Sequence, residues 1–160
     1  MDWRCLAIEI DGLDCDRLLS AWRWLVPDEL RPISLTMFGD WFLEDRRGCI
    51  YFLDTVGGTL SCIAPSRAAF LSERGKPENL GEWYMADLAL LCWESGLRPG
   101  VGTCLSFKVP PVLSGPVALD NVEVYDLMVH QSIMGQIHRG VKDLPEGTVI
   151  ERFTVDGEVP

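Results

Sequence analysis

Both histidines of the 160-residue chain lie in one segment that is predicted to be helical. Asp126, His130, Met134 and His138 follow one another at intervals of four residues, so a helix places them on one stripe. Imidazole and carboxylate groups on neighbouring turns can hold a metal ion or exchange a proton. His130 and His138 are about 12 Å apart along a helix axis, which is too far for one metal ion. A structural role is therefore the simpler hypothesis, and a small metal-dependent hydrolase using this helix is the alternative.

A second group of residues is acidic and aromatic, and this combination suits protein binding better than catalysis. Its members are Asp14, Asp16, Trp24, Trp41, Glu44 and Asp45. The two tryptophans fall off the apolar stripe of their predicted elements, and an exposed tryptophan beside carboxylates is a good anchor for a basic partner. We therefore predict a partner-binding surface at these six residues. No cofactor or metal is expected, because the carboxylates do not follow a calcium-loop pattern.

The charge of the whole chain favours the same kind of partner. Asp and Glu number 24 against 14 Lys and Arg, which gives a net charge of -10. Phosphate backbones and anionic lipids repel such a protein, so neither nucleic acid nor a membrane is an expected partner. A basic protein is favoured.

Signatures of catalysis and of export are not found in the sequence. The chain contains no Gly-x-Ser-x-Gly, P-loop or kinase motif. Its first residues do not form a signal peptide, and no apolar run approaches the roughly 20 residues of a membrane span. We expect a cytoplasmic protein that is not an enzyme.

The hydrophobic pattern predicts the elements that position these residues. Helices are predicted over residues 15–26, 66–73, 78–95 and 126–138, and strands over 38–44, 49–54, 59–63, 104–109, 117–125 and 148–155. Residues 28–36, which contain Pro32, are predicted to form a loop. Along 78–95 the predicted buried stripe includes Leu88, Leu91 and Cys92.

The order of these elements indicates the fold class. Strands come in runs instead of alternating with helices, which favours an α+β fold with a largely antiparallel sheet packed by three or four helices. The loops are short, so we expect one compact domain over residues 1–160, with 1–34 as an N-terminal helical extension.

Several short motifs occur in an order and at a spacing that resemble one known family. They are the segments 38–43 (FGDWFL), 48–54 (GCIYFLD), 57–58 (GG), 82–83 (EW), 102–111 (GTCLSFKVPP), 129–138 (VHQSIMGQIH) and 144–148 (LPEGT). Over residues 35–150 the chain resembles the C-terminal domain of Tdi-type immunity proteins of bacterial type VI secretion. It is also distantly similar to the SMI1/KNR4 (SUKH) superfamily.

The resemblance implies a non-catalytic immunity protein that binds a cognate toxin, a secreted DNase effector, and neutralises it by stoichiometric occlusion. The expected partner is then a basic, nuclease-like protein, and the chain itself is a monomer or a homodimer. An acidic protein suits this role, because nucleases hold DNA in basic clefts. A generic interaction or scaffold domain of the same superfamily is a further alternative.

Overall fold

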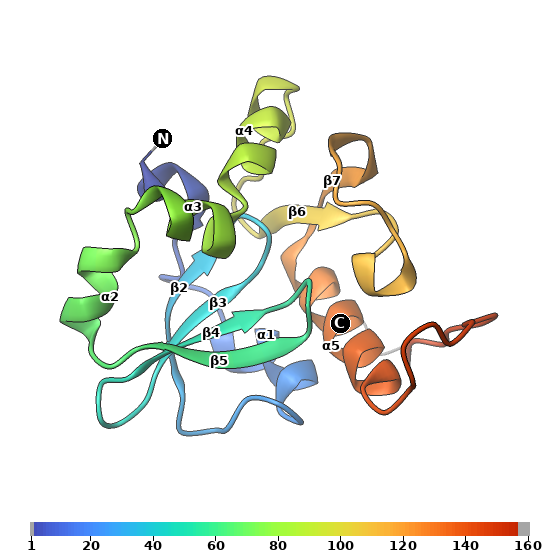
Figure 1. The fold of residues 1–160 in the computed structure, drawn as a ribbon, viewed down its shortest axis with the longest axis horizontal. Helices are drawn as coiled ribbons and strands as arrows, with labels where there is room; N and C mark the ends of the chain where they lie inside the picture. Colours follow the sequence, from blue (N-terminus) through green and yellow to red (C-terminus); the bar gives the residue numbers. More distant parts are fainter. Residues whose placement is uncertain (1, 157–160) are drawn as a thin grey trace.

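The computed structural model describes residues 2–156, in which two antiparallel sheets are packed among helices (Figure 1). The five-stranded sheet has the order β1-β2-β3-β4-β5, and the second sheet pairs β6 with β7. The strands are β1 (Ala7–Ile8), β2 (Arg31–Thr36), β3 (Trp41–Glu44), β4 (Ile50–Asp54), β5 (Thr59–Ala64), β6 (Thr103–Phe107) and β7 (Val122–Asp126). The predicted α+β class with a largely antiparallel sheet is confirmed.

Five α-helices and four short 3-10 helices connect and cover the strands of the described chain. The α-helices are α1 (Cys15–Leu18), α2 (Arg67–Glu73), α3 (Pro77–Tyr84), α4 (Ala86–Glu94) and α5 (Leu127–Val141). The 3-10 helices are η1 (Trp3–Leu6), η2 (Ser20–Trp22), η3 (Pro111–Leu113) and η4 (Leu119–Asn121). Figure 1 shows α1 behind β4 and β5, with α5 beside the two-stranded sheet. None of the helices within residues 2–156 has the length and apolar content that crossing a bilayer requires.

The central strands β3 and β4 of the five-stranded sheet are covered on both faces. Successive residues of β3 point to opposite faces, so Phe42 packs into one core while Trp41 and Leu43 pack into the other. The first core contains aromatic side chains of α2 and α3, and the second contains Trp22 of η2 and Leu127 of α5. A residue of β3 therefore meets a core whichever way it points, and Trp41 is fully buried.

Residues 28–36 were predicted to be a loop because of Pro32, and this prediction is wrong. Residues 31–36 form β2, which pairs with β3 with a bulge between Pro32 and Ser34, and which pairs with β1 only at Leu35 and Thr36. At Pro32 the other edge of β2 has no partner strand within the described chain. A proline lacks the N–H donor that a strand neighbour would need, so it is tolerated at this position.

Two predicted helices are broken in the structure. The segment 15–26 forms α1 and η2, because Trp22 and Trp24 turn towards α5 and donate hydrogen bonds to it. The segment 78–95 forms α3 and α4, which meet at Met85 in the left-handed conformation with φ of 50°. Tertiary contacts and one backbone rotation thus override a continuous helical pattern.

The predicted strand over residues 148–155 does not form. This segment passes beside α5, and the Asp156 N–H donates to the Gln136 side chain at 2.8 Å. A helix uses its own backbone groups internally and offers no strand edge. By contrast, residues 2–34 contribute β1 and the first residues of β2, so this stretch is built into the main sheet.

Candidate protein interface

The two histidines lie inside the molecule and attach α5 to the strands. His130 Nδ1 is 2.9 Å from Ser106 Oγ, and His138 Nε2 is 3.0 Å from the Thr55 backbone oxygen. Burial lowers the pKa of His130 to about 4, and it also holds the pKa of His138 below its usual value. Both imidazoles are therefore neutral near pH 7 and serve as buried hydrogen-bonding groups.

Asp126 does not join the histidines in a site. Its exposed carboxylate caps α5 by accepting the Val129 N–H at 2.9 Å. Within residues 2–156 no three His, Cys, Asp or Glu side chains are grouped so that they could hold a metal ion. The alternative hydrolase therefore has no assembled site at this helix.

A buried carboxylate ties two turns of the five-stranded sheet together. Asp40 Oδ1 accepts the N–H and the hydroxyl of Thr55, both at 2.8 Å, and Oδ2 accepts the hydroxyl of Thr36 at 3.0 Å. Burial, followed by the charge of Asp54, raises the pKa of Asp40 to about 7. Asp40, which belongs to the motif at residues 38–43, therefore stabilises the two turns by hydrogen bonds.

Gln131 of α5 forms two further buried hydrogen bonds, one to the turn before β3 and one to η2. Its Nε2 donates to the Gly39 backbone oxygen at 2.6 Å, and its Oε1 accepts the Trp22 indole N–H at 3.0 Å. Space is tight here, since a Cβ atom on Gly39 would lie 2.7 Å from His130 Nε2. The motifs around Gly39 and Gln131 thus describe how α5 docks on the strands.

The predicted partner-binding residues near α1 are engaged locally. Asp14 caps α1 by accepting the Arg17 N–H at 3.1 Å, and Asp16 pairs with Arg23 at 3.2 Å. Trp24 is half-buried, and its indole N–H donates to an α5 carbonyl at 3.1 Å. These side chains lie at the surface, but each already has a partner within the protein.

The residues predicted near β3 are also engaged. Glu44 accepts two hydrogen bonds from the Arg67 guanidinium, at 2.6 and 3.1 Å. Asp45 accepts the N–H groups of Arg47 and Cys49 in the turn after β3. Trp41, predicted to be part of the interface, is 0% exposed, so this assignment is wrong. No hydrogen bond or ion pair among residues 2–156 joins this group to Asp14 or Asp16.

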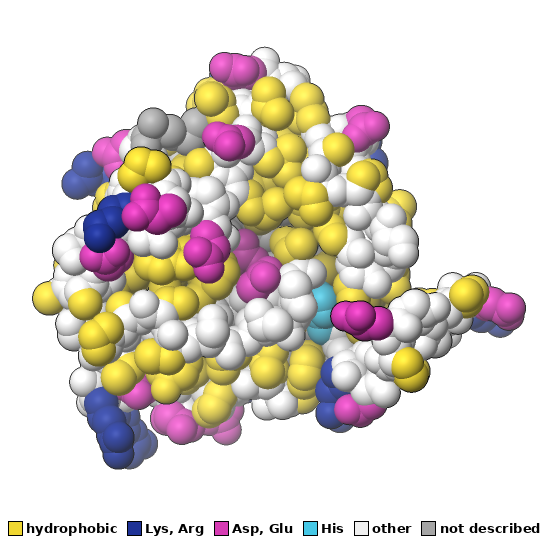
Figure 2. Space-filling model, viewed as in Figure 1, with side chains coloured by type: hydrophobic (Ala, Val, Ile, Leu, Met, Phe, Trp, Pro, Cys, Tyr) yellow, Lys and Arg dark blue, Asp and Glu magenta, His cyan; other side chains and the backbone are white. Residues whose placement is uncertain are grey.

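A different surface carries carboxylates that have no cationic partner. We call it the acidic ridge, and it consists of Glu78 and Glu82 of α3 with Asp87 and Glu94 of α4. All four are exposed, and none takes part in an ion pair within the described chain. Residues 77–97 contain no Lys or Arg. Figure 2 shows acidic side chains gathered over α3 and α4, with hydrophobic side chains beside them.

The hydrophobic side chains on α4 are unusually open to solvent. Leu90 is 41% exposed, Leu91 49% and Trp93 44%. Leu91 was predicted to be buried, and it is exposed because the break at Met85 gives α4 an orientation of its own. The absence of Lys and Arg over residues 77–97 was a sequence signal for the acidic ridge, whereas the exposure of Leu91 and Trp93 was not readable from periodicity.

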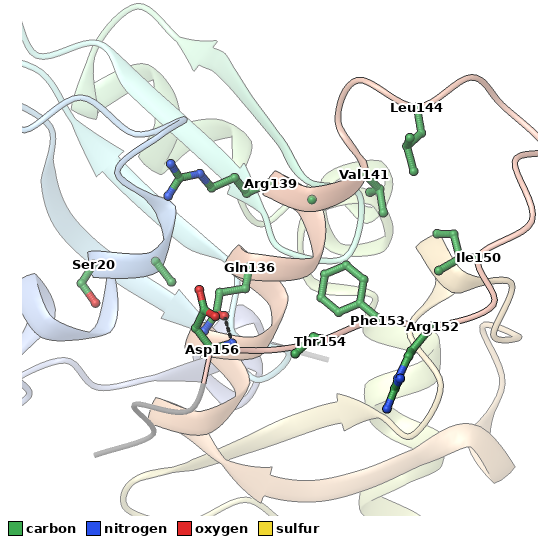
Figure 3. Close-up of a pocket in the computed structure, with 12 residues that line it drawn as sticks. Ser20, Gln136, Arg139, Val141, Leu144, Ile150, Arg152, Phe153, Thr154 and Asp156 are labelled. Carbon is green, nitrogen blue, oxygen red and sulfur yellow. Dashed lines mark hydrogen bonds between the residues drawn. The ribbon is translucent and has the colours of Figure 1, made fainter.

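A cavity of about 780 Å³ lies between α5 and the C-terminal segment (Figure 3). Arg139 and Arg152 line it, but their side chains extend away from one another in Figure 3. Because its polar groups do not converge, this cavity does not define a binding site.

These features describe an α+β domain with carboxylates of α3 and α4 that form no ion pair within residues 2–156. Residues 64–138, just under half of the chain, match the family model "T6SS immunity protein Tdi1, C-terminal". The match confirms the predicted resemblance to the C-terminal domain of Tdi1 immunity proteins over this segment. Proteins of the matched family are immunity proteins, which neutralise toxins and are typically non-catalytic.

Other comparisons add a distant structural similarity. The crystal structure of Atu4351 from Agrobacterium tumefaciens matches with 13% sequence identity and a TM-score of 0.47. The match covers 76% of this chain and 63% of that chain, so this chain spans less than two thirds of that protein's length. No curated protein matches the sequence.

Proposed function

We propose that this protein neutralises a basic toxin, a DNase, by binding to it one to one and covering its DNA-binding cleft. The family supports toxin neutralisation, and the chemistry of the surface supports a basic partner. The observation that carries the proposal is the acidic ridge, where Glu78, Glu82, Asp87 and Glu94 form no ion pair with any residue of the described range 2–156.

Free carboxylates act at longer range than paired ones. A carboxylate already bonded to an arginine, such as Glu44, has its field largely cancelled, while those of the acidic ridge add to the potential felt by an approaching cation. A basic cleft would meet four such groups within 17 residues of chain. Complementary charge of this kind accelerates association and blocks the phosphate-binding groups of a nuclease.

The residues predicted from the sequence form a second proposed contact surface. Asp14, Asp16, Trp24, Glu44 and Asp45 all reach the surface, although hydrogen bonds or ion pairs hold each of them. We expect this surface to contribute less to association than the acidic ridge does.

The first experiment is a pull-down of the tagged protein from its native lysate at low and at high salt. The captured protein is identified by mass spectrometry, produced by itself and mixed with this chain. The proposal expects a basic nuclease that binds one to one and stops cleaving DNA when the chain is added. A partner that stays active in the complex would contradict neutralisation, and an acidic partner would contradict the electrostatic argument.

Charge-reversal variants then locate the contact surface. Replacing Glu82→Lys together with Asp87→Lys should lower the association rate constant at least about tenfold and flatten its salt dependence, because both changes act on the steering field. Stopped-flow fluorescence measures both quantities.

The matched control carries the same change of charge at another place. Glu44→Lys with Asp45→Lys should lower the association rate constant less than about threefold, because these two residues lie outside the acidic ridge, where the main contact is proposed. A larger effect of this control pair than of the ridge pair would move the contact to the surface predicted from the sequence.

A further inference from the structure

An apolar groove separates α4 from the N-terminal elements η1 and β1. Its deeper part is a cavity of about 360 Å³ lined by Cys5, Leu6, Met37, Ala89, Leu90 and Trp93. A second cavity of about 350 Å³ shares Cys5, Met37 and Trp93 with the first and continues past β1 to the loop at residues 99–102. Together they form one groove, which we call the α4 groove.

The deeper walls of the α4 groove are mainly apolar. Met37 forms part of the floor, and its backbone is fixed on two sides, by the Met37 N–H to Leu6 and by the Leu105 N–H to the Met37 oxygen. Trp93 forms one wall, with the Arg98 guanidinium 4.7 Å from its ring centroid. Exposed apolar surface of this kind is typical of protein contact sites.

The rim of the α4 groove is acidic. Glu9 and Asp11 line its outer part, and both are exposed without an ion pair in the described chain. On α4, Asp87 lies three residues before Leu90 and Glu94 four residues after it, so both stand one helical turn from that groove residue. Two carboxylates therefore line the groove, two more stand one helical turn from Leu90, and the Arg98 guanidinium lies over Trp93.

We propose that the α4 groove binds a large apolar side chain of the toxin that is flanked by Lys or Arg residues; this inference rests on the proposed function. An apolar side chain gains free energy by leaving water for the groove, and the flanking cations meet the acidic rim. A cavity near the lower end of the range for ligand pockets, about 300 Å³, has room for an aromatic side chain. A second copy of the chain is a poor occupant, because its acidic rim would face the same carboxylates.

The test uses a defined peptide and needs no toxin. The isotope-labelled protein is titrated with Lys-Arg-Lys-Phe-Lys-Arg-Lys, and amide chemical shifts are followed by NMR. We expect shifts at Met37, Leu90 and Trp93, at least about fivefold weaker affinity when alanine replaces the central phenylalanine, and no shift when glutamate replaces the flanking cations. Equal binding of the phenylalanine and alanine peptides, or shifts centred elsewhere, would overturn the proposal.

Paired variants separate the groove from general surface hydrophobicity. Leu90→Ala should weaken the peptide at least about fivefold, while Leu71→Ala on α2 should change its affinity less than about twofold. Both leucines are exposed, 41% and 49%, so neither truncation removes a core side chain. Glu9→Gln with Asp11→Asn should weaken the peptide and reduce the salt dependence of its binding. Equal effects of the two leucine variants would contradict the proposal.

The two proposals fail in different ways. A salt-sensitive one-to-one complex with the toxin, together with no peptide binding in the α4 groove, would overturn the groove and leave the proposed function intact. Peptide binding in the groove together with a toxin that remains active in the complex would overturn neutralisation and support the groove.

Discussion

Asp40 and His130 are both buried titratable groups. Their burial changes the pH dependence of stability in opposite directions. Folded Asp40, with a pKa of about 7, keeps a proton that an unfolded aspartate releases near pH 4, so its contribution to stability falls as the pH rises between these values. Folded His130, with a pKa of about 4, stays neutral where an unfolded histidine takes up a proton below about pH 6.5. Its contribution to stability therefore rises with pH over nearly the same range.

Replacing Asp40 by asparagine should expose the contribution of the histidines. In Asp40→Asn the free energy of unfolding should rise between about pH 4.5 and about pH 6.5, more steeply than in the wild type by up to about 1.4 kcal/mol per pH unit. The variant should also be less stable by about 1–3 kcal/mol at the lower pH, because the Thr36 hydroxyl loses its acceptor. Urea unfolding across this pH range measures both effects.

The control for this variant is the same substitution at an exposed carboxylate. Asp143→Asn lies on the surface after α5 and should leave the pH profile parallel to that of the wild type. If Asp40→Asn also gave a parallel profile, the raised pKa of Asp40 would be refuted.

Helix α5 packs closely against η2, and at Gly135 of α5 there is no room for a side chain. A Cβ atom on Gly135 would lie 2.6 Å from the Ala21 backbone oxygen, and that backbone belongs to η2, which cannot shift without disturbing Trp22. The close contact between α5 and η2 is possible because Gly135 has no side chain.

A pair of glycine substitutions tests this packing. Gly135→Ala should destabilise the protein by about 1–3 kcal/mol, because the added methyl group meets backbone atoms. Gly81→Ala in α3 should stabilise it by about 0.5–1 kcal/mol, since nothing lies within 4 Å of the added Cβ and alanine is the better helix former. Thermal and urea unfolding report both changes, and a stabilising Gly135→Ala would show that α5 and η2 are not in close contact.

How much of each element could be predicted from sequence depended on whether its determinants are local. The strands β3, β4 and β5 are rich in β-forming residues and are separated by turn residues. They were placed nearly correctly. The break at Met85 was not predictable, because the left-handed conformation is rare for methionine and is imposed by packing of α3 and α4 on one core. The strand β2 was missed because a proline is excluded from a strand only where a neighbouring strand needs its N–H group. The sequence does not show that the edge of β2 at Pro32 has no such neighbour.

The candidate site was harder to predict than the fold, because surface exposure is a property of the whole assembly. Trp41 was placed in the interface on the assumption of a sheet with one buried face, and covering of both faces removes it from the surface. Leu91 was placed in the buried stripe of residues 78–95 and is instead 49% exposed on α4. Charge was more informative, since the run without Lys or Arg over residues 77–97 is visible in the sequence.

For the whole molecule, the distribution of charge matters more than its sum. A net charge of -10 would repel any acidic surface from every side, but local ion pairs at Glu44, Asp16 and Asp28 reduce the field on their part of the protein. The carboxylates of α3 and α4 form no ion pair within the described chain and keep their field. A basic partner should therefore arrive in a preferred orientation, with its cations towards α3 and α4.

This orientation predicts which rate constant salt will change. Raising the ionic strength from about 0.05 M to about 0.5 M shortens the Debye length from above 10 Å to below 5 Å, so steering fades while close contacts persist. The association rate constant of the toxin complex should fall at least about tenfold, and the dissociation rate constant should change less than about threefold. Surface plasmon resonance with the toxin immobilised measures both constants, and the Glu82→Lys, Asp87→Lys variant should have lost most of the salt effect. A salt effect confined to dissociation would mean that the charged contacts form only after docking, and that the acidic ridge does not guide the encounter.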